Sequence, residues 1–412
     1  MAKSKSLVKS REDQGTKREL DWFELAFGFK ENPSQLYERD NEYISVQYNG
    51  HDVPPNENDA NSPELNKACP TITCKKSGEV FQCGFFSTPS LNELRERNIE
   101  RMPSGTTEVE RIPEETSGKA PKHRSKLKLS IEIGDAAALH EKYPFSTIQV
   151  ASQLNCLEFV SPTGNPENGV TKYSSDHTQG PACCLCTAPA VVYRNYYHPY
   201  KYVDGITVYG QTKSNQWNNL VDIEKKIGNE DGKYWTVQGG YTMSEKSKLM
   251  KIPWPSFDFE ELKGLLRIGI HEDTQITSFG NWGLKINKKD RESRITHVLS
   301  SACAIGYNGF EIQPWTELAK IVLQATYEAT LYAGLENYHR NIDKQHSNKV
   351  LLTLVGGGVF RNPSLWILEA IEKACLKFQD TPLDVRIVAF NQPDKTMVAT
   401  IDRIKKQMLK TK

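Results

Sequence analysis

Three consecutive glycines, Gly356 to Gly358, follow the apolar run VLLTLV and precede a segment with helical periodicity. Without side chains, backbone N–H groups can crowd around an anion at the positive end of a helix, so this arrangement fits a diphosphate. A tight turn that needs positive φ would use the same residues. The loop has neither Gly-Lys-Ser/Thr nor GxGxxG, which disfavours kinases, P-loop NTPases and simple Rossmann dehydrogenases.

Polar side chains follow two expected strands. Gly134-Asp135 ends LKLSIEIG, where a carboxylate could accept a hydrogen bond from a purine amine or cap the next helix. Ser152, Gln153 and Asn155 end TIQVASQLN and suit hydroxyl recognition, although solvation of a strand edge would look the same.

The long polar loop 161–182 contains Glu167, Asp176, His177 and Gln179 before Gly180-Pro181 and an Ala/Cys-rich helix. A carboxylate beside a helix start built from small residues lies where a sugar or anion could approach closely. Asp176 could equally cap that helix.

The elements that must position these residues begin near residue 128. Apolar runs of strand length at 127–134, 147–154, 296–305, 350–355 and 385–390 alternate with helical periodicity, which is typical of a layered α/β domain. Helices are expected at 364–378 and from Trp315 to about Leu335. In the first of these, one apolar face comprises Ile367, Ile371, Ala374, Cys375 and Phe378, as packing on a sheet requires.

The N-terminal part of the chain has a different composition. Residues 1–19 read as a charged, disordered tail, and 51–78 and 102–127 as loops rich in Pro, Ser, Asn, Gly and charge. Short aromatic runs between them are too few for an independent core. The sequence therefore predicts an extension over 20–127 docked on a main domain over 128–412.

Charge and composition exclude several classes of function. The 52 Lys and Arg residues nearly balance 51 Asp and Glu, so no overall field favours a polyanion, and direct nucleic-acid binding is not expected. No apolar window approaches the roughly 18 residues of a membrane span. Nine cysteines without an export signal indicate free thiols, and Cys69, Cys74 and Cys83 are too loosely spaced for a zinc site. An intracellular soluble protein is expected.

The order and spacing of these pieces resemble the macrodomain family, whose members bind ADP-ribose. The matching segments are Gly134-Asp135, Gln153 to Asn155, Gln179 to Ala182, and Gly358 to Pro363. The sequence is most similar to a divergent branch of arginine-directed ADP-ribosyl hydrolases. The motifs that carry this similarity, over roughly residues 20 to 391, are FSTPSLNELR, QVASQLNCLEF, NGVTKYSSDHTQGPAC, VYRNYY, the stretch 300–307, ATYEATLYA and LLTLVGGGVFRN.

The resemblance implies a macrodomain-like three-layer α/β/α fold with a mixed sheet, enlarged by insertions and the N-terminal extension. It implies hydrolysis of the N-glycosidic bond between ADP-ribose and arginine in mono-ADP-ribosylated proteins, without cofactor or metal, in the cytoplasm and also the nucleus. A reader that binds ADP-ribose without catalysis is the alternative. The implied binding residues are Asp135, Ser152, Gln153, Asn155, Gln179, Gly180, Gly356, Gly357, Gly358, Val359, Phe360, Asn362 and Asn391.

Such hydrolysis passes through an oxocarbenium-like state and needs a carboxylate near C1 of the ribose. Asp176 is the first choice. Glu328 lies at the edge of an apolar helical stripe and could point into a cleft, or it could be a solvated helix carboxylate. Glu167 and Glu158 are held in reserve.

Overall fold

The computed structural model describes residues 20–48, 69–102, 126–203, 206–287 and 290–410, and its centre is a seven-stranded mixed sheet. The strands lie in the order β4 (Phe85–Ser87), β11 (Gly269–Gln275), β12 (Arg294–Ser300), β6 (Thr147–Ala151), β13 (Lys349–Leu352), β14 (Asp384–Ala389) and β5 (Lys128–Ile133). The five strands from β12 to β5 are parallel, while β11 is antiparallel to both of its neighbours. The carboxyl ends of five strands therefore meet at one edge of the sheet.

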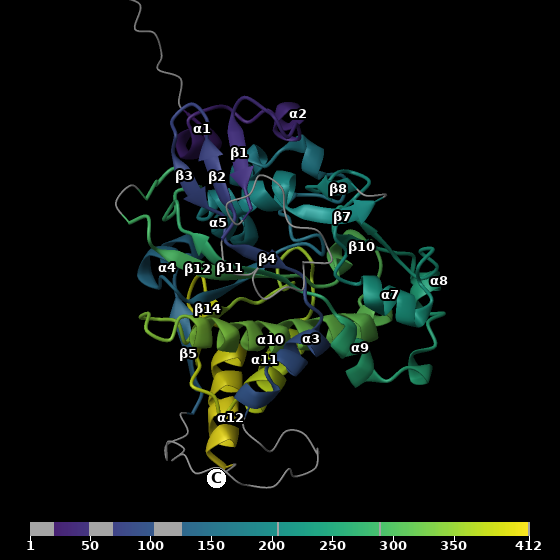
Figure 1. The fold of residues 1–412 in the computed structure, drawn as a ribbon. Coiled ribbons are helices and arrows are strands. Elements are labelled where there is room, and N and C mark those ends of the chain that lie inside the picture. Colours follow the sequence, from purple (N-terminus) through teal and green to yellow (C-terminus); the bar gives the residue numbers. More distant parts are fainter. Residues whose placement is uncertain (1–19, 49–68, 103–125, 204–205, 288–289, 411–412) are drawn as a thin grey trace, which may run out of the picture.

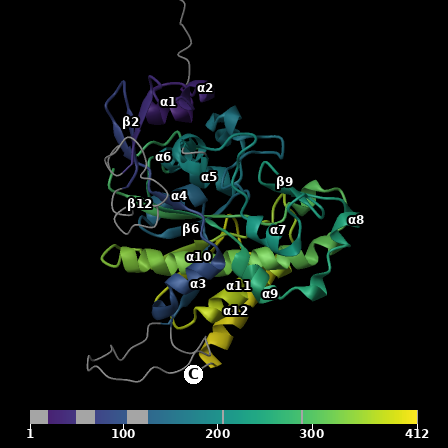
Figure 2. The same ribbon diagram turned by 45° about the vertical axis from the view of Figure 1, so that its right-hand side comes forward.

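Helices cover both faces of the sheet (Figure 1). The long helix α10 (Thr316–Arg340) and α11 (Ser364–Lys377) lie on one face, where α3 (Leu91–Arg97) and α9 (Phe259–Leu265) pack on α10 and α12 (Lys395–Lys410) packs on α11. On the other face lie α4 (Ala136–Lys142), α5 (Gln179–Leu185) and α6 (Ala188–Val192), as the turned view in Figure 2 also shows. The three-layer α/β/α class with a mixed sheet is confirmed.

The N-terminal segment adds α1 (Trp22–Phe27), α2 (Pro33–Leu36) and a small sheet of β1 (Ile44–Gln47), β2 (Thr71–Cys74) and β3 (Val80–Gln82). Its aromatic side chains Trp22, Phe23 and Phe27 share a buried core with α5 and α6. The segment also supplies β4 to the main sheet and α3 to α10. The prediction of a loop throughout 51–78 is wrong at β2, while the tail and residues 51–68 and 103–125 lie outside the described residues.

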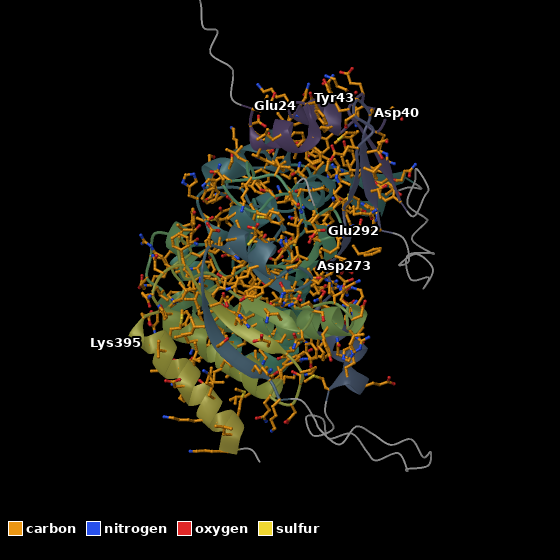
Figure 3. The ribbon with its side chains drawn as sticks, turned by 90° about the vertical axis from the view of Figure 1, so that its left-hand side faces the viewer. Glu24, Asp40, Tyr43, Asp273, Glu292 and Lys395 are labelled. Carbon is orange, nitrogen blue, oxygen red and sulfur yellow. The ribbon has the colours of Figure 1, made fainter. Side chains whose placement is uncertain are left out.

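Insertions between β6 and β12 carry the remaining small elements. These are the hairpin β7 (Pro199–Val203) and β8 (Ile206–Tyr209), helix α7 (Val221–Ile227), the pair β9 (Thr236–Gln238) and β10 (Tyr241–Met243), and helix α8 (Lys246–Leu249). Charged side chains such as Asp40, Glu292 and Lys395 lie on the surface (Figure 3). No helix in the described parts of the chain is both long and apolar enough to cross a membrane.

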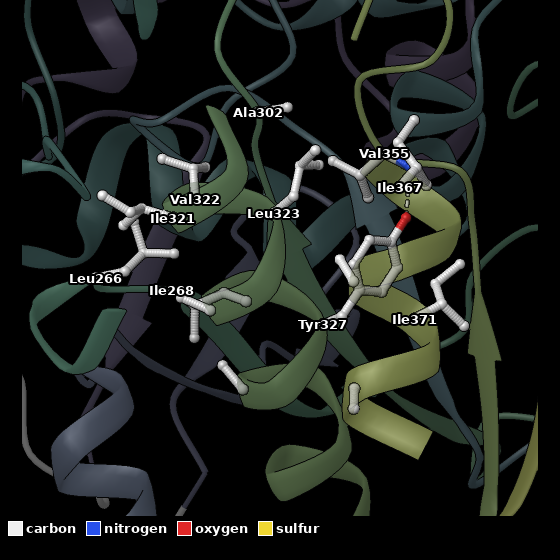
Figure 4. Packing of buried hydrophobic residues seen from close by; sticks show 14 of the residues in the cluster. Leu266, Ile268, Ala302, Ile321, Val322, Leu323, Tyr327, Val355, Ile367 and Ile371 are labelled. Atoms are coloured by element: carbon white, nitrogen blue, oxygen red, sulfur yellow. Dashed lines mark hydrogen bonds between the residues drawn. The ribbon is translucent and has the colours of Figure 1, made fainter. Parts of the chain in front are cut away.

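The strands and helices expected from residue 128 onward all form, and the apolar face predicted for α11 is buried. Helix α10 continues to Arg340, past the expected end at Leu335. A buried tyrosine of α10 fixes the start of the glycine loop (Figure 4): the Tyr327 hydroxyl donates to the Thr353 carbonyl at 2.7 Å and accepts from the Val355 N–H at 3.0 Å. The packed helix layer thereby positions the loop that follows β13.

Candidate functional site

Two adjoining cavities open where the parallel strands end. The larger has a volume of about 540 Å³ and the smaller about 330 Å³, and both are lined by His177, Thr178, Gln179 and Thr353. Because they share these walls, they form one elongated depression. Volumes of ~300–1,000 Å³ are usual for small-molecule sites. Crevices at the carboxyl ends of strands in open α/β sheets are where ligands bind.

The glycine loop forms one wall of the larger cavity through Gly356, Gly358, Val359 and Phe360. Gly356 has φ +78°, and a Cβ there would lie 2.5 Å from the Ala302 Cβ, so only glycine fits. The N–H groups of Gly358, Val359 and Phe360 donate to no acceptor within the described residues. The loop therefore has three backbone donors without an acceptor at the wall of the cavity, as an anion site requires.

The other two loop residues predicted to bind ligand lie behind this wall. The N–H of Gly357 donates to the Leu354 carbonyl at 3.1 Å, and Gly357 does not line the cavity. The Asn362 Nδ2 donates to the Cys303 carbonyl at 2.8 Å and to the Gly356 carbonyl at 3.3 Å. Both residues hold the loop in shape, so direct contact with a ligand is expected from its outer residues.

The smaller cavity is lined by Asp135, which also caps α4: its Oδ1 accepts from the Ala137 N–H at 2.7 Å. The two readings of Asp135 are compatible, because the second oxygen of the carboxylate is not used by the cap. Phe390 and Trp282 line the same cavity, and the Phe390 side chain is 74% exposed. Trp282 stacks on His177 with ring centroids 4.4 Å apart. These aromatic faces suit a planar base.

The polar residues after β6 divide into two groups. Ser152 and Gln153 line the larger cavity, and the Gln153 Oε1 accepts from the Phe159 N–H at 3.0 Å. Gln179 lines both cavities and extends the end of β6, since its Oε1 accepts from the Ala151 N–H at 2.7 Å. Asn155 is buried behind Gln153 and donates to the Gln216 Oε1 at 2.7 Å. It therefore supports the wall without lining it.

Glu158 is the most unusual carboxyl group of the site. It lines the larger cavity with 1% of its surface exposed, and its Oε2 has no hydrogen-bond partner in the described chain. Gly180 allows this placement, because a Cβ at that position would lie 2.4 Å from the same oxygen. Burial raises the pKa of Glu158 to about 8, against the lowering effects of Ser152 and Arg194. At neutral pH Glu158 is therefore mainly a carboxylic acid.

Asp176 lines the larger cavity from the loop that precedes α5 and is half-buried. Its carboxylate forms no hydrogen bond or ion pair with any described residue. Its negative charge also contributes to the raised pKa of Glu158. The cavity thus holds, beside Asp176, a second carboxyl group whose pKa is raised, an arrangement suited to general acid and base catalysis.

Aromatic side chains close the same end of the larger cavity. The rings of Tyr241 and Tyr307 lie 4.9 Å apart, and the Tyr241 ring lies 5.2 Å from that of Phe360. The Tyr241 hydroxyl donates to the Phe159 carbonyl at 2.5 Å, which ties this wall to the strand-end segment that carries Glu158. These rings line the same cavity as the two carboxyl groups.

Three predicted site residues lie elsewhere. The prediction that Glu328 points into the cleft is wrong: it is buried between α3 and α11, where Arg95 Nε donates at 2.8 Å and Lys377 Nζ at 2.6 Å. These two cations keep its pKa low in spite of burial. Glu167 is exposed on a short 3₁₀ turn, and Asn391 is exposed beyond β14. Neither lines the two cavities.

Metal ligands are absent from the described residues, in which no group of three or more His, Cys, Asp or Glu side chains could hold an ion. The nine cysteines are all free thiols.

No protein-family model matches the chain, and no curated protein matches it. The chain is similar to solved structures of poly(ADP-ribose) glycohydrolase. One is the Deinococcus radiodurans protein in complex with ADP-ribose, at 12% identity and a TM-score of 0.40, covering 78% of this chain and 94% of that chain. Another is the protein from Thermomonospora curvata, at 12% identity and a TM-score of 0.39, covering 81% of this chain and 93% of that chain.

Proposed function

We propose that this protein binds ADP-ribose in the two joined cavities and hydrolyses the N-glycosidic bond between its distal ribose and an arginine side chain of a modified protein. One observation carries the proposal: a buried carboxylic acid with an unpartnered oxygen, Glu158, shares a cavity with the unpartnered carboxylate Asp176. A site that only binds ADP-ribose does not need a carboxylic acid next to a second carboxyl group.

The walls of the depression suit the parts of ADP-ribose in order. The smaller cavity offers Asp135 to the adenine amine and the faces of Phe390 and Trp282 to the ring. The free N–H groups of the glycine loop suit the diphosphate, as charge-assisted donors do. The distal ribose then lies in the larger cavity, within reach of Gln153 and the two carboxyl groups.

The chemistry follows from the two protonation states. As the bond between C1 and the guanidinium nitrogen breaks, positive charge develops on the ribose, and the Asp176 carboxylate stabilises it. Asp176 accepts a proton from the water that attacks C1, while Glu158 donates its proton to the leaving nitrogen. ADP-ribose and an unmodified arginine result, and a second proton exchange with water restores both carboxyl groups.

A third cavity supports an arginine-bearing substrate. It has a volume of about 820 Å³, and its lining residue Gly240 packs against Gln153, which lines the 540 Å³ cavity: a Cβ at Gly240 would lie 2.5 Å from the Gln153 Cβ. Its lining contains Glu224, Glu230 and Asp231 but only one cation, Lys213. This excess of negative charge favours a basic segment next to the modified side chain.

Gly358→Val tests the binding half of the proposal. A Cβ at Gly358 meets no atom within 4 Å, so the variant should fold with an unchanged Tm, but its side chain would fill the space in front of the free N–H groups. We expect ADP-ribose affinity measured by calorimetry to fall ~10- to 100-fold, the equivalent of one lost charge-assisted hydrogen bond or more. Gly358→Ala should give a smaller loss. Unchanged affinity in the valine variant would mean that the loop does not hold the diphosphate.

A further inference from the structure

Behind Glu158 lies a buried guanidinium that the binding of ADP-ribose does not use. Arg194 is fully buried on the π-helical turn Tyr193–Tyr197 that follows α6. Such turns are rare and are found mostly at functional sites. Neither of the two joined cavities is lined by Arg194.

Each end of the guanidinium is held by a specific partner. Its Nη1 lies 2.8 Å from the His271 Nδ1, and its Nε donates to the Cys156 carbonyl at 3.2 Å. Because arginine can only donate, His271 accepts through Nδ1 and carries its own proton on Nε2. Burial keeps the pKa of His271 well below its usual range, so this histidine remains neutral.

The remaining guanidinium nitrogen of Arg194 is connected to the Glu158 carboxyl group through one thiol. The Arg194 Nη2 donates to the Cys184 Sγ at 3.4 Å, and this thiol in turn lies 3.9 Å from the Glu158 Oε1. No carboxylate in the described chain forms an ion pair with Arg194. Glu158 is the carboxyl group to which the contacts of Arg194 lead, and the Arg194 charge lowers the pKa of that carboxyl group.

We propose that Arg194, acting through Cys184, is a positioning residue that fixes the Glu158 carboxyl group in the cavity and controls its ionisation. The inference deepens the proposed function, on which its catalytic consequence rests. The thiol contacts Oε1, so Oε2, which has no hydrogen-bond partner in the described chain, is the oxygen left to carry the proton.

The charges around Glu158 give the direction of the effect. Burial and, to a smaller extent, the charge of Asp176 raise the pKa of Glu158 to about 8, while Ser152, Arg194 and Cys184 act in the opposite direction. The neighbouring Tyr173, Tyr241 and Cys156 stay neutral near pH 8, because burial raises the pKa of each. Burial also raises the pKa of Cys184, which remains a thiol. Removal of the Arg194 charge therefore moves the ionisation of Glu158 to higher pH.

Infrared difference spectroscopy can follow this ionisation without catalysis. The reference is the protonated-carboxyl band that is present in the native protein and absent from Glu158→Gln. We expect its midpoint to rise by about one pH unit or more in Arg194→Met and to move back in Arg194→Lys, which retains the charge. Cys184→Ala should also raise the midpoint, and Cys184→Ser, which keeps a donor and an acceptor, should restore it.

Cys186→Ala is the matched control, because Cys186 is equally buried but contacts the carbonyls of Ala182 and Ala137 instead. If Arg194→Met does not fold, the two Cys184 variants decide. If both variants fold, a native midpoint in Arg194→Met and in Cys184→Ala would overturn the inference. If Arg194→Met is unfolded, a native midpoint in Cys184→Ala would overturn it.

The alkaline limb of the turnover profile, which reports loss of the Glu158 proton, should move with the infrared midpoint. A protein that releases no ADP-ribose but shows the infrared shifts would refute the proposed function and leave the role of Arg194 standing. An active protein whose variants titrate like the native one would support the proposed function and refute the role of Arg194.

Discussion

Glu158→Gln is expected to lower the rate of ADP-ribose release by ~10³-fold, within the range for loss of a general acid. The amide has nearly the same shape but cannot donate a proton as a carboxylic acid does. Because ADP-ribose itself lacks the leaving group, its dissociation constant should change by no more than a few-fold, and binding should separate from turnover.

Single-turnover kinetics and calorimetry on the same preparation measure the two effects. Glu292→Gln is the control, since Glu292 is exposed and lines neither of the two cavities. A Glu158→Gln protein that retains native turnover would assign the proton donor to another group or to water.

Asp176→Asn should lower turnover by ~100-fold or more, because the carboxylate acts on charge that develops only in the transition state. The asparagine preserves shape, so the complex with ADP-ribose should still form. The substitution also removes a negative charge that helps to raise the pKa of Glu158, and this pKa should therefore fall.

The pH profile distinguishes the two consequences. Glu158 acts as an acid and loses its proton as pH rises, so the alkaline limb of the Asp176→Asn profile should lie at lower pH than the native limb. A variant with native turnover and a native alkaline limb would contradict the assignment of Asp176.

The main architecture could be predicted because it depends on local patterns. The strand-length apolar runs 127–134, 147–154 and 350–355 form parallel strands, and parallel strands bring their carboxyl ends together. The predicted residues Asp135, Gln153, Gln179 and Gly358 therefore line one depression.

Local sequence patterns do not show which of the candidate carboxylates lie at the catalytic site. The sequence pattern allows Glu328 either to point into a cleft or to be a solvated helix carboxylate, but its partners Arg95 and Lys377 come from distant segments that pack on α10 only in the folded chain. Glu158 stands within the apolar run CLEFV and ranks below Asp176 and Glu328 on spacing alone. A charged residue in such a run is buried without local compensation, and that signal favours function.

The aromatic walls depend on insertions whose positions no periodicity reveals. Tyr241 comes from the pair β9 and β10, Trp282 from the loop before β12, and Phe390 from the end of β14. Only Phe390 carries a usable signal, because it is the last residue of the strand predicted over 385–390.

The release of ADP-ribose from defined conjugates tests the central claim most directly. Native protein would be incubated with an arginine-linked mono-ADP-ribosylated protein, a glutamate-ester-linked one and poly(ADP-ribose), with the free ADP-ribose quantified in each. We predict release from the arginine conjugate, little from the other two, and loss of the arginine activity in Glu158→Gln and Asp176→Asn. Native protein that binds ADP-ribose but releases none from the arginine conjugate would contradict the account and favour a reader.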